Sequence, residues 1–557
     1  MRWALLLVCL AGCEPPADAA VRTHADDWRD EIVYQIVVDR FDDGDPGNDV
    51  LEGIGPEPDD LARFQGGDWA GVRGRLDYLE ALGVTAIWLS PPYANVQRTE
   101  SEDGYHGYWP SDFTEANPRF GTLEELRGLV DEAHARDMLV ILDVVPNHAG
   151  RVFTYDLDAD GEIDPGEVEP PYADPPYEAP LLFSHAPRMW RAVGDGYERV
   201  TLGPEHFHRR GFGDLSDPLQ KELGDFPTGL RDLDTERPEV VDLLVDTHVW
   251  WVEQTDVDGF RIDAVPHAGR AFWASFDARL RRRLAEIGKE RFLLLGEVFV
   301  TRPETLARYT ELDQLDSVFA FDLKETLING VILEGRPPSV AVPALSTNRS
   351  FFPASGQPGG IGIDPWSARA VFGDNHDVFR LRGELDDPLA VEIALTAVMT
   401  VDGMPVIYYG TEQGLDGTRH HLSREPLWRA AGFDEGHPMF AHVARLTALR
   451  RGSLALRRGT LEVRYASRSG GADEAPEADA GMLAWERAFE DERLLTVLNA
   501  SLDDSVAEVP TGFGEGTLLF DALEATDVPW RVGARGVLSI RLPGRAAVVL
   551  RSRPGRE

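Results

Sequence analysis

Short hydrophobic runs alternate with longer amphipathic stretches along most of the chain. The runs are almost continuously apolar, which is typical of parallel strands buried on both faces. They lie at residues 32–41, 84–90, 138–148, 257–265, 291–300, 316–323, 369–377 and 405–412. Between them, segments such as 122–137 and 238–255 have the periodicity of helices with one buried face. Eight strands alternating with helices predict a (β/α)8 TIM barrel.

Two regions break this alternation. Residues 149–234 are rich in proline, aspartate, glycine and aromatic residues, and they are too many for a loop between barrel elements, so we predict an inserted domain. Short strand-like runs separated by turn formers predict a C-terminal antiparallel β-sandwich at 451–557. The barrel would comprise 30–148 and 235–450. The alternative, an open doubly wound sheet, is disfavoured because no glycine-rich phosphate loop follows the first run.

The first thirteen residues, MRWALLLVCLAGC, have the form of a secretory signal: one positive charge, then an apolar run too short to span a bilayer. The ending resembles a bacterial lipobox, so we expect Cys13 to carry a lipid and residues 14–29 to form a tether. An ordinary signal peptide with a chance cysteine is the alternative. Cleavage in front of Cys13 would leave no pair of cysteines to form a disulfide, since the only other cysteine is Cys9. We expect an exported protein whose lipid anchors it to a bacterial membrane, on the periplasmic or cell-surface side.

Charge narrows the range of partners. A net charge of −41 over 557 residues would repel the phosphates of nucleic acids, so we expect no such partner. It suits a protein that handles neutral substrates or binds cations. We expect a monomer that contacts the membrane only through its lipid.

Polar side chains gather where four of the hydrophobic runs end. They are Asp143, Asn147 and His148; Arg261, Asp263 and His267; Glu297; and Asn375, His376 and Asp377. The carboxyl ends of barrel strands meet at one face, so these side chains would lie together there. A polar cap on a strand explains any one of them, but several buried carboxylates are costly unless they pair or react. The pattern predicts an active site at this face.

Four segments around these residues, DVVPNH, GFRIDAVPH, GEVF and FGDNHD, resemble in order the signature segments of the α-amylase family of glycoside hydrolases. Further similarity, in GVTAIWLSPP, GYHGYWPSDF, LRDLD and GMPVIYYGTEQ, extends the resemblance over about residues 30–550. It implies retaining cleavage of α-1,4-glucosidic bonds in starch-like glucans or maltodextrins, through a covalent glycosyl-enzyme. Asp263 would be the nucleophile, Glu297 the general acid and base, and Asp377 would hold the sugar.

The resemblance also implies a set of sugar-binding side chains. They are His106, Tyr108, Trp109, His148, Arg261, His267, Asn375 and His376. Arg261 would keep Asp263 ionised, and the ring of Tyr108 would stack on the sugar. Repulsion by the other carboxylates would raise the pKa of Glu297, so that it can act as an acid.

Within the family, the chain most resembles cyclodextrin glucanotransferases and their hydrolytic relatives. Many members carry lysine where this chain has Pro266, and the cyclising enzymes carry an aromatic residue where it has Thr228. The extra C-terminal domains of the cyclising enzymes are not evident. These departures favour plain hydrolysis over a 4-α-glucanotransferase or cyclomaltodextrinase-type enzyme, which is the alternative. An inactive surface glucan-binding protein is disfavoured, because all three catalytic carboxylates are present.

Clusters of carboxylate and amide oxygens, the ligands that calcium prefers, predict two or three Ca²⁺ sites. By resemblance, one site would use Asn147, Asp232 and the carbonyl of His267. By the same resemblance, a second would use Asp43, Asp45, Asn48, Asp49, the carbonyl of Gly66, and Asp68.

A third calcium site is predicted from residues 156–167, DLDADGEIDPGE. This segment fills the ligand positions of an EF-hand loop but lacks the flanking helices. Its ligands would be Asp156, Asp158, Asp160, the carbonyl of Glu162, Asp164 and Glu167. For this loop and for the second site, a solvated acidic turn is the alternative.

Overall fold

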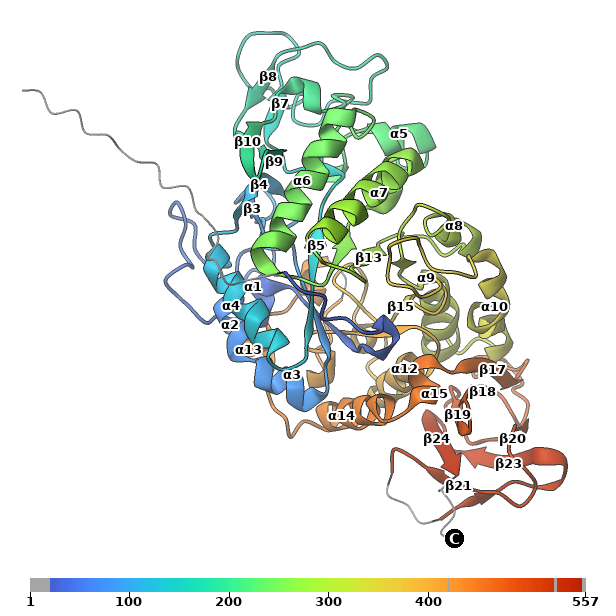
Figure 1. The fold of residues 1–557 in the computed structure, drawn as a ribbon. Helices are drawn as coiled ribbons and strands as arrows, with labels where there is room; N and C mark the ends of the chain where they lie inside the picture. The colour runs from blue at the N-terminus through green and yellow to red at the C-terminus, as the bar shows by residue number, and fades with distance from the viewer. Residues whose placement is uncertain (1–20, 419, 525–527, 553–557) are drawn as a thin grey trace, which may run out of the picture.

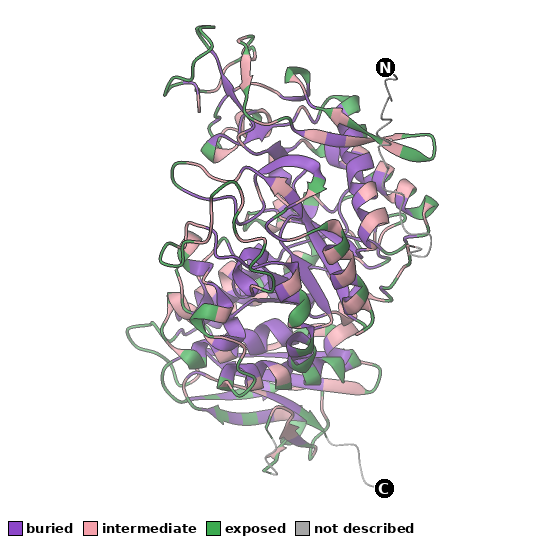
Figure 2. Ribbon diagram, turned by 90° about the vertical axis from the view of Figure 1, so that its left-hand side faces the viewer, coloured by how far each residue is buried: buried purple, intermediate pink, exposed green. Residues whose placement is uncertain are grey.

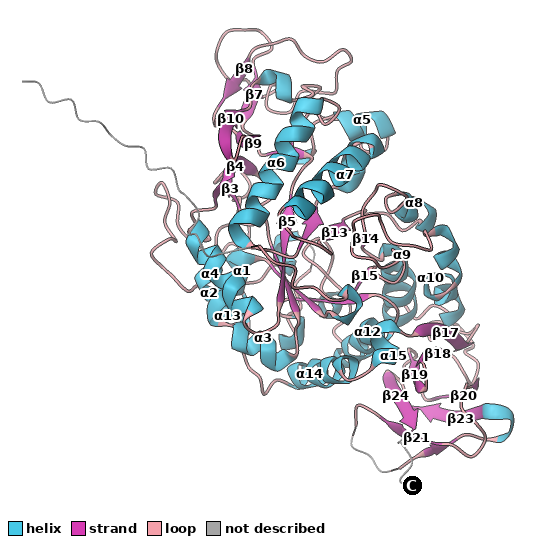
Figure 3. Ribbon diagram, viewed as in Figure 1, coloured by secondary structure: helices cyan, strands magenta, loops and turns pink. Residues whose placement is uncertain are grey.

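A computed structural model describes residues 21–418, 420–524 and 528–552, and it places the eight hydrophobic runs in one parallel sheet. The strands are β1 (Val33–Ile36), β2 (Ala86–Leu89), β5 (Leu139–Val144), β12 (Gly259–Ile262), β13 (Leu293–Gly296), β14 (Ser317–Val318), β15 (Ala370–Phe372) and β16 (Met404–Tyr408). Their order is β14-β13-β12-β5-β2-β1-β16-β15. A bridge from Phe319 to Ala370 joins the two edges, so the sheet is a nearly closed barrel (Figure 3). The predicted fold class is confirmed.

Strand β5 shows why the runs are continuously apolar. Leu139 and Ile141 belong to the cluster inside the barrel, whereas Val140 and Leu142 belong to the larger cluster between the sheet and its helices. Successive side chains point to opposite faces of a strand, so both sets must be apolar when both faces are covered. Figure 2 shows the resulting buried centre in purple.

Helices surround the barrel. They include α2 (Trp69–Gly74), α3 (Leu76–Leu82), α4 (Leu123–His134), α6 (Pro238–Thr255), α7 (Arg270–Glu286), α8 (Pro303–Arg308), α12 (Pro388–Thr400) and α14 (Pro438–Arg451). The start of α4 follows from its sequence: Thr122 accepts from the Glu125 backbone, and the Glu125 carboxylate accepts from the Thr122 backbone. This capping box satisfies two amides that the helix itself leaves unpaired.

A long excursion separates β5 from α6. It begins with β6 (His148–Ala149), which pairs antiparallel with β11 (Arg231–Asp232), so the two ends of the excursion meet. Between them lie β7 (Phe153–Tyr155), β8 (Leu181–Phe183), β9 (Arg188–Val193), β10 (Gly196–Thr201) and α5 (Pro218–Leu223). We propose that residues 149–234 form the inserted domain. It lies at the opposite end of the molecule from the C-terminal sheet (Figure 1).

The C-terminal strands form antiparallel sheets, as predicted. They are β17 (Thr460–Ala466), β18 (Met482–Phe489), β19 (Glu492–Asn499), β20 (Ser505–Pro510), β21 (Leu518–Asp521), β22 (Trp530–Arg531), β23 (Val537–Leu542) and β24 (Ala546–Ser552). Six of them pair in the order β17-β18-β19-β24-β21-β22, and β20 pairs with β23. Buried Arg487 of β18 donates to the Val401 carbonyl of the barrel, which fixes the two parts together.

The predicted lipid-bearing Cys13 and residues 14–20 of the predicted tether lie outside the described residues. The second half of that tether packs on the barrel: Trp28 is fully buried, and its indole donates to the Arg291 carbonyl at 2.8 Å. The backbone N–H of Arg22 also donates to Asp256 at 2.9 Å. Within the described residues, no helix has the length and apolar character needed to span a bilayer.

Candidate active site

A cavity of about 520 Å³ opens at the carboxyl ends of the barrel strands. The predicted residues that line it are His106, Tyr108, Trp109, His148, Asp263, His267, Glu297, His376 and Asp377. Another hollow, of about 620 Å³, lies against α7 and residues 357–362 and contains none of the predicted site residues. We therefore take the first cavity as the candidate active site.

Arg261 lies beneath the cavity and joins its carboxylates. Its Nη1 is 2.8 Å from Asp263 Oδ1 and 3.0 Å from Asp143 Oδ1, and its Nη2 is 3.1 Å from Glu297 Oε2. The side chain is only 1% exposed, so these contacts have little water to compete with them. Arg261 is the last but one residue of β12 and precedes Asp263 by two positions, which places both side chains on the same face of the chain. One guanidinium therefore orients the predicted nucleophile and the predicted acid.

The pKa of Glu297 is raised to about 8, chiefly because burial disfavours its charged form. Arg261 opposes this shift, while Asp263 and Asp377 add to it. The direction agrees with the sequence-based expectation, but the main cause does not: burial outweighs repulsion between carboxylates. Glu297 is therefore protonated at neutral pH, as a general acid requires.

Asp377 has the opposite character. Burial alone would raise its pKa, but His376 and Arg424 hold that pKa well below the ordinary value. His376 Nε2 lies 2.9 Å from Asp377 Oδ2, and Arg424 Nη2 lies 3.1 Å from Asp377 Oδ1. The cavity therefore contains one protonated carboxyl and one firmly ionised carboxylate, which is the division of roles that acid catalysis needs.

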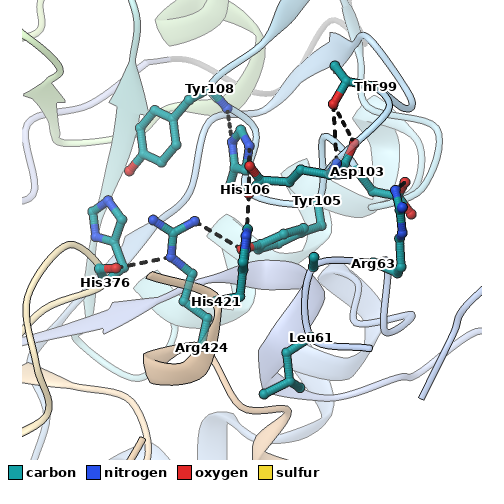
Figure 4. Close-up of polar contacts among 12 residues, drawn as sticks. Leu61, Arg63, Thr99, Asp103, Tyr105, His106, Tyr108, His376, His421 and Arg424 are labelled. Carbon is teal, nitrogen blue, oxygen red and sulfur yellow. Dashed lines mark hydrogen bonds and ion pairs between the residues drawn. The ribbon is translucent and has the colours of Figure 1, made fainter. Parts of the chain in front are cut away.

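The aromatic and imidazole rings form one wall of the cavity. The ring of Tyr108 is stacked against both His376, at 5.4 Å between centroids, and His106, at 5.6 Å (Figure 4). Its hydroxyl donates to Asp143 at 2.7 Å. Trp109 is 5% exposed and meets His106 edge-on. The half-buried ring of Tyr108 therefore offers only part of its surface to a sugar.

For three of the predicted sugar-binding residues, burial or packing against other side chains limits direct contact with a ligand. Asn375 is 4% exposed, does not line the cavity, and accepts from the Asp377 backbone at 2.9 Å, so it orients Asp377. His148 and His267 both line the cavity, and both pack against Phe226, at 5.1 Å and 4.6 Å between centroids. Burial lowers the pKa of His267 to about 3, so its ring is neutral.

The structure adds residues to which sequence reasoning gave no role in the site. They are Glu102, Asp143, Tyr105, His421, Arg424, Phe226 and Phe299. Asp143 had a signal, because it ends a hydrophobic run, and burial raises its pKa to about 7. Arg424 had none, because it lies in a loop well after β16 and only the fold brings it to Asp377.

The side-chain oxygens of the N-terminal calcium site predicted by resemblance are of two kinds: some have no hydrogen-bond partner, and others accept hydrogen bonds. Within the described chain, Asp43 Oδ1, Asn48 Oδ1 and Asp49 Oδ1 are buried without a hydrogen-bond partner. Asp68 instead accepts from four donors, including the backbone N–H groups of Gly71 and Asp45 at 2.6 and 2.8 Å. Exposed Asp45 accepts from the Gly47 backbone. The three unpartnered oxygens fit a bound cation, since such oxygens are costly to bury alone.

Gly66 completes this turn. Its φ is +103°, and a Cβ atom there would lie 2.4 Å from Asp49 Oδ1. Burial, followed by the charges of Asp43 and Asp68, raises the pKa of Asp49 to about 6. No cationic side chain bonds these three oxygens in the described part of the chain. Among the described residues, the turn therefore buries three oxygen atoms without a protein cation bonded to them.

The site predicted between the barrel and the insertion fits a cation less completely. Asn147 Oδ1 is buried and unpartnered among the described residues. Asp232, however, bonds His208. Burial would lower the pKa of His208, but hydrogen bonds and charges from Asp232 and Glu236 raise it to about 10. A histidine side chain therefore already pairs with one of the predicted calcium ligands.

The predicted EF-hand-like loop brings its acidic side chains together. Ligand oxygens of Asp156, Asp158 and Glu167 lie within 4.8 Å of one another, as do those of Asp158, Asp160 and Asp164. Asp156 and Glu167 are buried, whereas Glu162 is exposed. Strand β7 precedes the loop, turns follow it, and no helix flanks it. Backbone N–H groups donate to Asp156, Asp160 and Glu167.

Residues 35–441 match the family model of the α-amylase catalytic domain. The chain belongs to this family. The match includes the barrel, the insertion and every residue that lines the cavity.

Known relatives include both hydrolases and transferases. An α-amylase of Streptomyces lividans is 29% identical over 89% of this chain and 57% of its own length. A cyclomaltodextrin glucanotransferase of Geobacillus stearothermophilus is 29% identical over 87% of this chain and 61% of its own length. The chain thus spans about three-fifths of each relative.

Solved structures are similar over almost the whole chain. An α-amylase of Geobacillus thermoleovorans, solved with acarbose, has a TM-score of 0.70 at 27% identity over 95% of this chain and 100% of its own. A cyclomaltodextrin glucanotransferase with a three-domain ABC distribution has a TM-score of 0.75 at 26% identity over 94% and 99%. A cyclising enzyme can therefore have three domains, so the absence of evident further C-terminal domains does not by itself favour hydrolysis over cyclisation.

Proposed function

We propose that the protein is a retaining glycoside hydrolase that cleaves α-1,4-glucosidic bonds of starch-like glucans or maltodextrins. The observation that carries this proposal is the bridge that Arg261 makes between Asp263 and Glu297. Retention requires a nucleophile and an acid on opposite sides of one sugar carbon, held at a short separation. A single guanidinium that contacts both groups supports that arrangement.

The electrostatics assign a role to each carboxyl group. Glu297, with its pKa raised to about 8, would donate a proton to the leaving glycosidic oxygen. Asp263, paired with Arg261, would attack the anomeric carbon and form the glycosyl-enzyme. Glu297 would then take a proton from water, whose oxygen attacks the same carbon and releases Asp263. Asp377, held ionised by His376 and Arg424, would accept hydrogen bonds from the sugar hydroxyls.

Trapping of the intermediate tests this assignment. A 5-fluoro-α-glucosyl fluoride should label the protein once, and peptide mass spectrometry should find the sugar on Asp263. Nuclear magnetic resonance of products released from maltoheptaose should show the α-anomer first. Label on another residue, or initial release of the β-anomer, would contradict the proposal.

Transfer activity is the second candidate, and one observation bears on it. Thr228, at the position where cyclising enzymes have an aromatic residue, lines the cavity with φ at +70°. A small residue there leaves no ring against which a glucan could curl. We therefore propose hydrolysis as the main reaction. Chromatography of products from starch would detect cyclic or lengthened glucans if transfer dominates.

We propose that calcium stabilises the protein. The N-terminal turn is the site best supported, because the unpartnered oxygens of Asp43, Asn48 and Asp49 are ligands that calcium accepts. The 156–167 loop is a second, separate proposal, supported by its convergent carboxylates. The Asn147 site is the least supported, because His208 already pairs with Asp232. Calcium would supply positive charge and cross-linking at these positions, away from the chemical step.

We also propose that the protein is exported and anchored through a lipid on Cys13. The described chain begins against residues 256 and 291, which precede β12 and β13 and so lie at the amino ends of the barrel strands. The cavity opens at the opposite ends of the barrel strands. Cys13→Ser should move the full-length protein from the membrane fraction to the soluble fraction. A wild-type protein that is already soluble would contradict the proposal.

A further inference from the structure

Eight side chains form a closed ring of contacts beside the cavity. They are Asp377, Arg424, Tyr105, His421, Glu102, His106, Tyr108 and His376, which returns to Asp377. Figure 4 shows His421 and Tyr105 beside Arg424, with His106 and Tyr108 across from them. Only part of this ring is needed by the proposed chemistry, so the remainder requires another explanation.

Arg424 holds one side of the ring. Its Nη2 donates to Asp377 at 3.1 Å, its Nη1 to the Tyr105 hydroxyl at 3.1 Å, and its Nε to the His376 carbonyl at 3.0 Å. Tyr105 is fully buried, and the guanidinium of Arg40 lies 3.6 Å from the centre of its ring. Because all three guanidinium nitrogens are bonded, Arg424 is fixed in one orientation.

Glu102 and His421 close the other side. His421 Nδ1 lies 3.2 Å from Glu102 Oε1 and 3.0 Å from the Tyr105 hydroxyl. His106 Nδ1 accepts from the Tyr108 backbone at 3.0 Å, which leaves the proton on Nε2, 3.8 Å from Glu102 Oε1. Glu102 is 9% exposed, and it is one of the residues that line the cavity. We name the Glu102–His421 contact the clasp.

Contacts of the neighbouring residue hold the loop that carries Glu102 in place. Neighbouring Asp103 is fully buried and accepts from the Arg63 guanidinium at 3.2 Å and the Phe64 backbone at 3.1 Å. Its own backbone N–H donates to the Ala62 carbonyl at 2.9 Å. The clasp therefore joins two loops that are far apart in the sequence, and the Glu102 side is rigidly supported.

The proposed chemistry determines which part of the glucan lies beside the ring of contacts. Glu297 would protonate the leaving group, so that part of the glucan lies toward Glu297, Pro266 and Phe299, which also line the cavity. The sugars that stay on the enzyme, the glycone, lie on the side of Asp377, where the ring is. Because neighbours in the ring contact one another directly, a glucan chain cannot pass between them.

We propose that the clasp closes the glycone end of the cavity, so that the enzyme binds a short glycone and releases short products. The carboxylate of Glu102 accepts a hydrogen bond from a hydroxyl group of the last bound glucose. A further sugar unit would displace that hydroxyl group. This inference rests on the proposed hydrolysis and specifies which glucans fit. It makes Glu102 and His421 determinants of product size.

The test compares product sizes from maltoheptaose tagged at its reducing end. The wild type should release mainly glucose and maltose from the untagged end at early times. Glu102→Ala should raise the ratio of maltotriose and longer products to shorter ones by about fivefold, the ratio that a partly buried ion pair of typical strength can support. His421→Ala should do the same, and the double variant should add little, since both remove one contact.

Glu100→Ala is the matched control, because exposed Glu100 lies in the same loop and pairs with Arg151 at 2.9 Å on the surface. It should leave the product ratio unchanged. An unchanged ratio in folded Glu102→Ala, or early release of long products by the wild type, would overturn the inference while leaving hydrolysis intact. A wild type with no action on α-glucans would contradict the proposed function and this inference together.

Discussion

The molecule has two regions crowded with carboxylates, and it balances their charge in different ways. In the cavity, the guanidinium of Arg261 contacts Asp143, Asp263 and Glu297. In the N-terminal turn, oxygens of Asp43 and Asp49 are buried and unpartnered among the described residues. Both regions are costly to bury, but in the described part of the chain only the first has a cationic side chain bonded to these oxygens.

This difference explains how each region can serve a purpose. The cavity must hold its carboxylates in fixed and unequal protonation states while substrate enters and leaves, and a covalently attached arginine gives that permanence. The turn needs only to stay folded, and a diffusible ion can meet that need. The comparison therefore predicts that substitutions of the cavity carboxylates change chemistry and that loss of the cavity arginine also lowers stability. Substitutions in the turn should change stability and its dependence on calcium.

The largest effect should come from the chemistry itself. Glu297→Gln should lower kcat on starch by at least about 10³-fold, because the amide cannot donate a proton or later accept one. Asp263→Asn should be as severe, because the amide cannot form the covalent intermediate. Circular dichroism should show both variants folded. Near-wild-type turnover in either purified variant would remove that residue from its role.

Loss of the internal cation should affect stability as well as activity. Arg261→Met leaves three carboxylates without their partner, and we expect a loss of about 3–5 kcal/mol in the free energy of unfolding. Urea unfolding measures this. Arg73→Met is the control, because Arg73 pairs with Glu132 on the surface, where an ion pair contributes about 0–1 kcal/mol. Equal losses in both variants would refute the proposed charge balance.

The pH profile should report the raised pKa of Glu297. A general acid works only in its protonated form, so kcat/KM should fall about tenfold per pH unit above pH 8, where Glu297 ionises. Measurement on a chromogenic maltoside between pH 5 and 10 tests this, with unfolding followed in parallel. An alkaline decline centred near pH 5 would mean that burial does not protect the proton.

The sequence predicted the barrel well because each strand carries its own signal. A run such as 138–148 is apolar at every position until Asp143, and neither tertiary contacts nor partners are needed to recognise it. The signature residues Asp263, Glu297 and Asp377 follow the strands for the same reason. Arg424 and Glu102 were missed, because loops carry no periodicity and because contacts such as Arg424 with Tyr105 and Glu102 with His421 join residues far apart in the sequence. The sequence also did not reveal that burial is the main cause of the raised pKa of Glu297, since burial is a property of the fold.

Calcium should stabilise a variant of the N-terminal turn less than it stabilises the wild type. At about 100 times its Kd, calcium should raise the free energy of unfolding by about 2.7 kcal/mol. In Asp49→Ala this increment should shrink, because an unpartnered ligand oxygen is removed. In the control Asp45→Ala it should shrink less, since the Asp45 side chain is exposed and already bonds the Gly47 backbone. Thermal unfolding with and without a chelator measures both, and equal increments in all three proteins would argue against the turn as a calcium site.

The smallest effect should come from the 156–167 loop, where carboxylates again converge without a cationic partner but most of them are exposed. Asp156→Ala with Asp160→Ala should remove one calcium per chain by metal analysis and speed proteolysis near residues 150–180, with kcat little changed.

Both alanines also remove hydrogen bonds to backbone N–H groups, so the same pair changed to asparagine separates the loss of calcium from the loss of these hydrogen bonds. Asparagine keeps an acceptor oxygen but lowers the charge, and calcium should still be lost or weakened. Glu178→Ala with Asp195→Ala removes two exposed acids from the same insertion and should change neither stoichiometry nor proteolysis. An unchanged calcium count in the alanine pair would show that the loop is an acidic turn held by its own backbone.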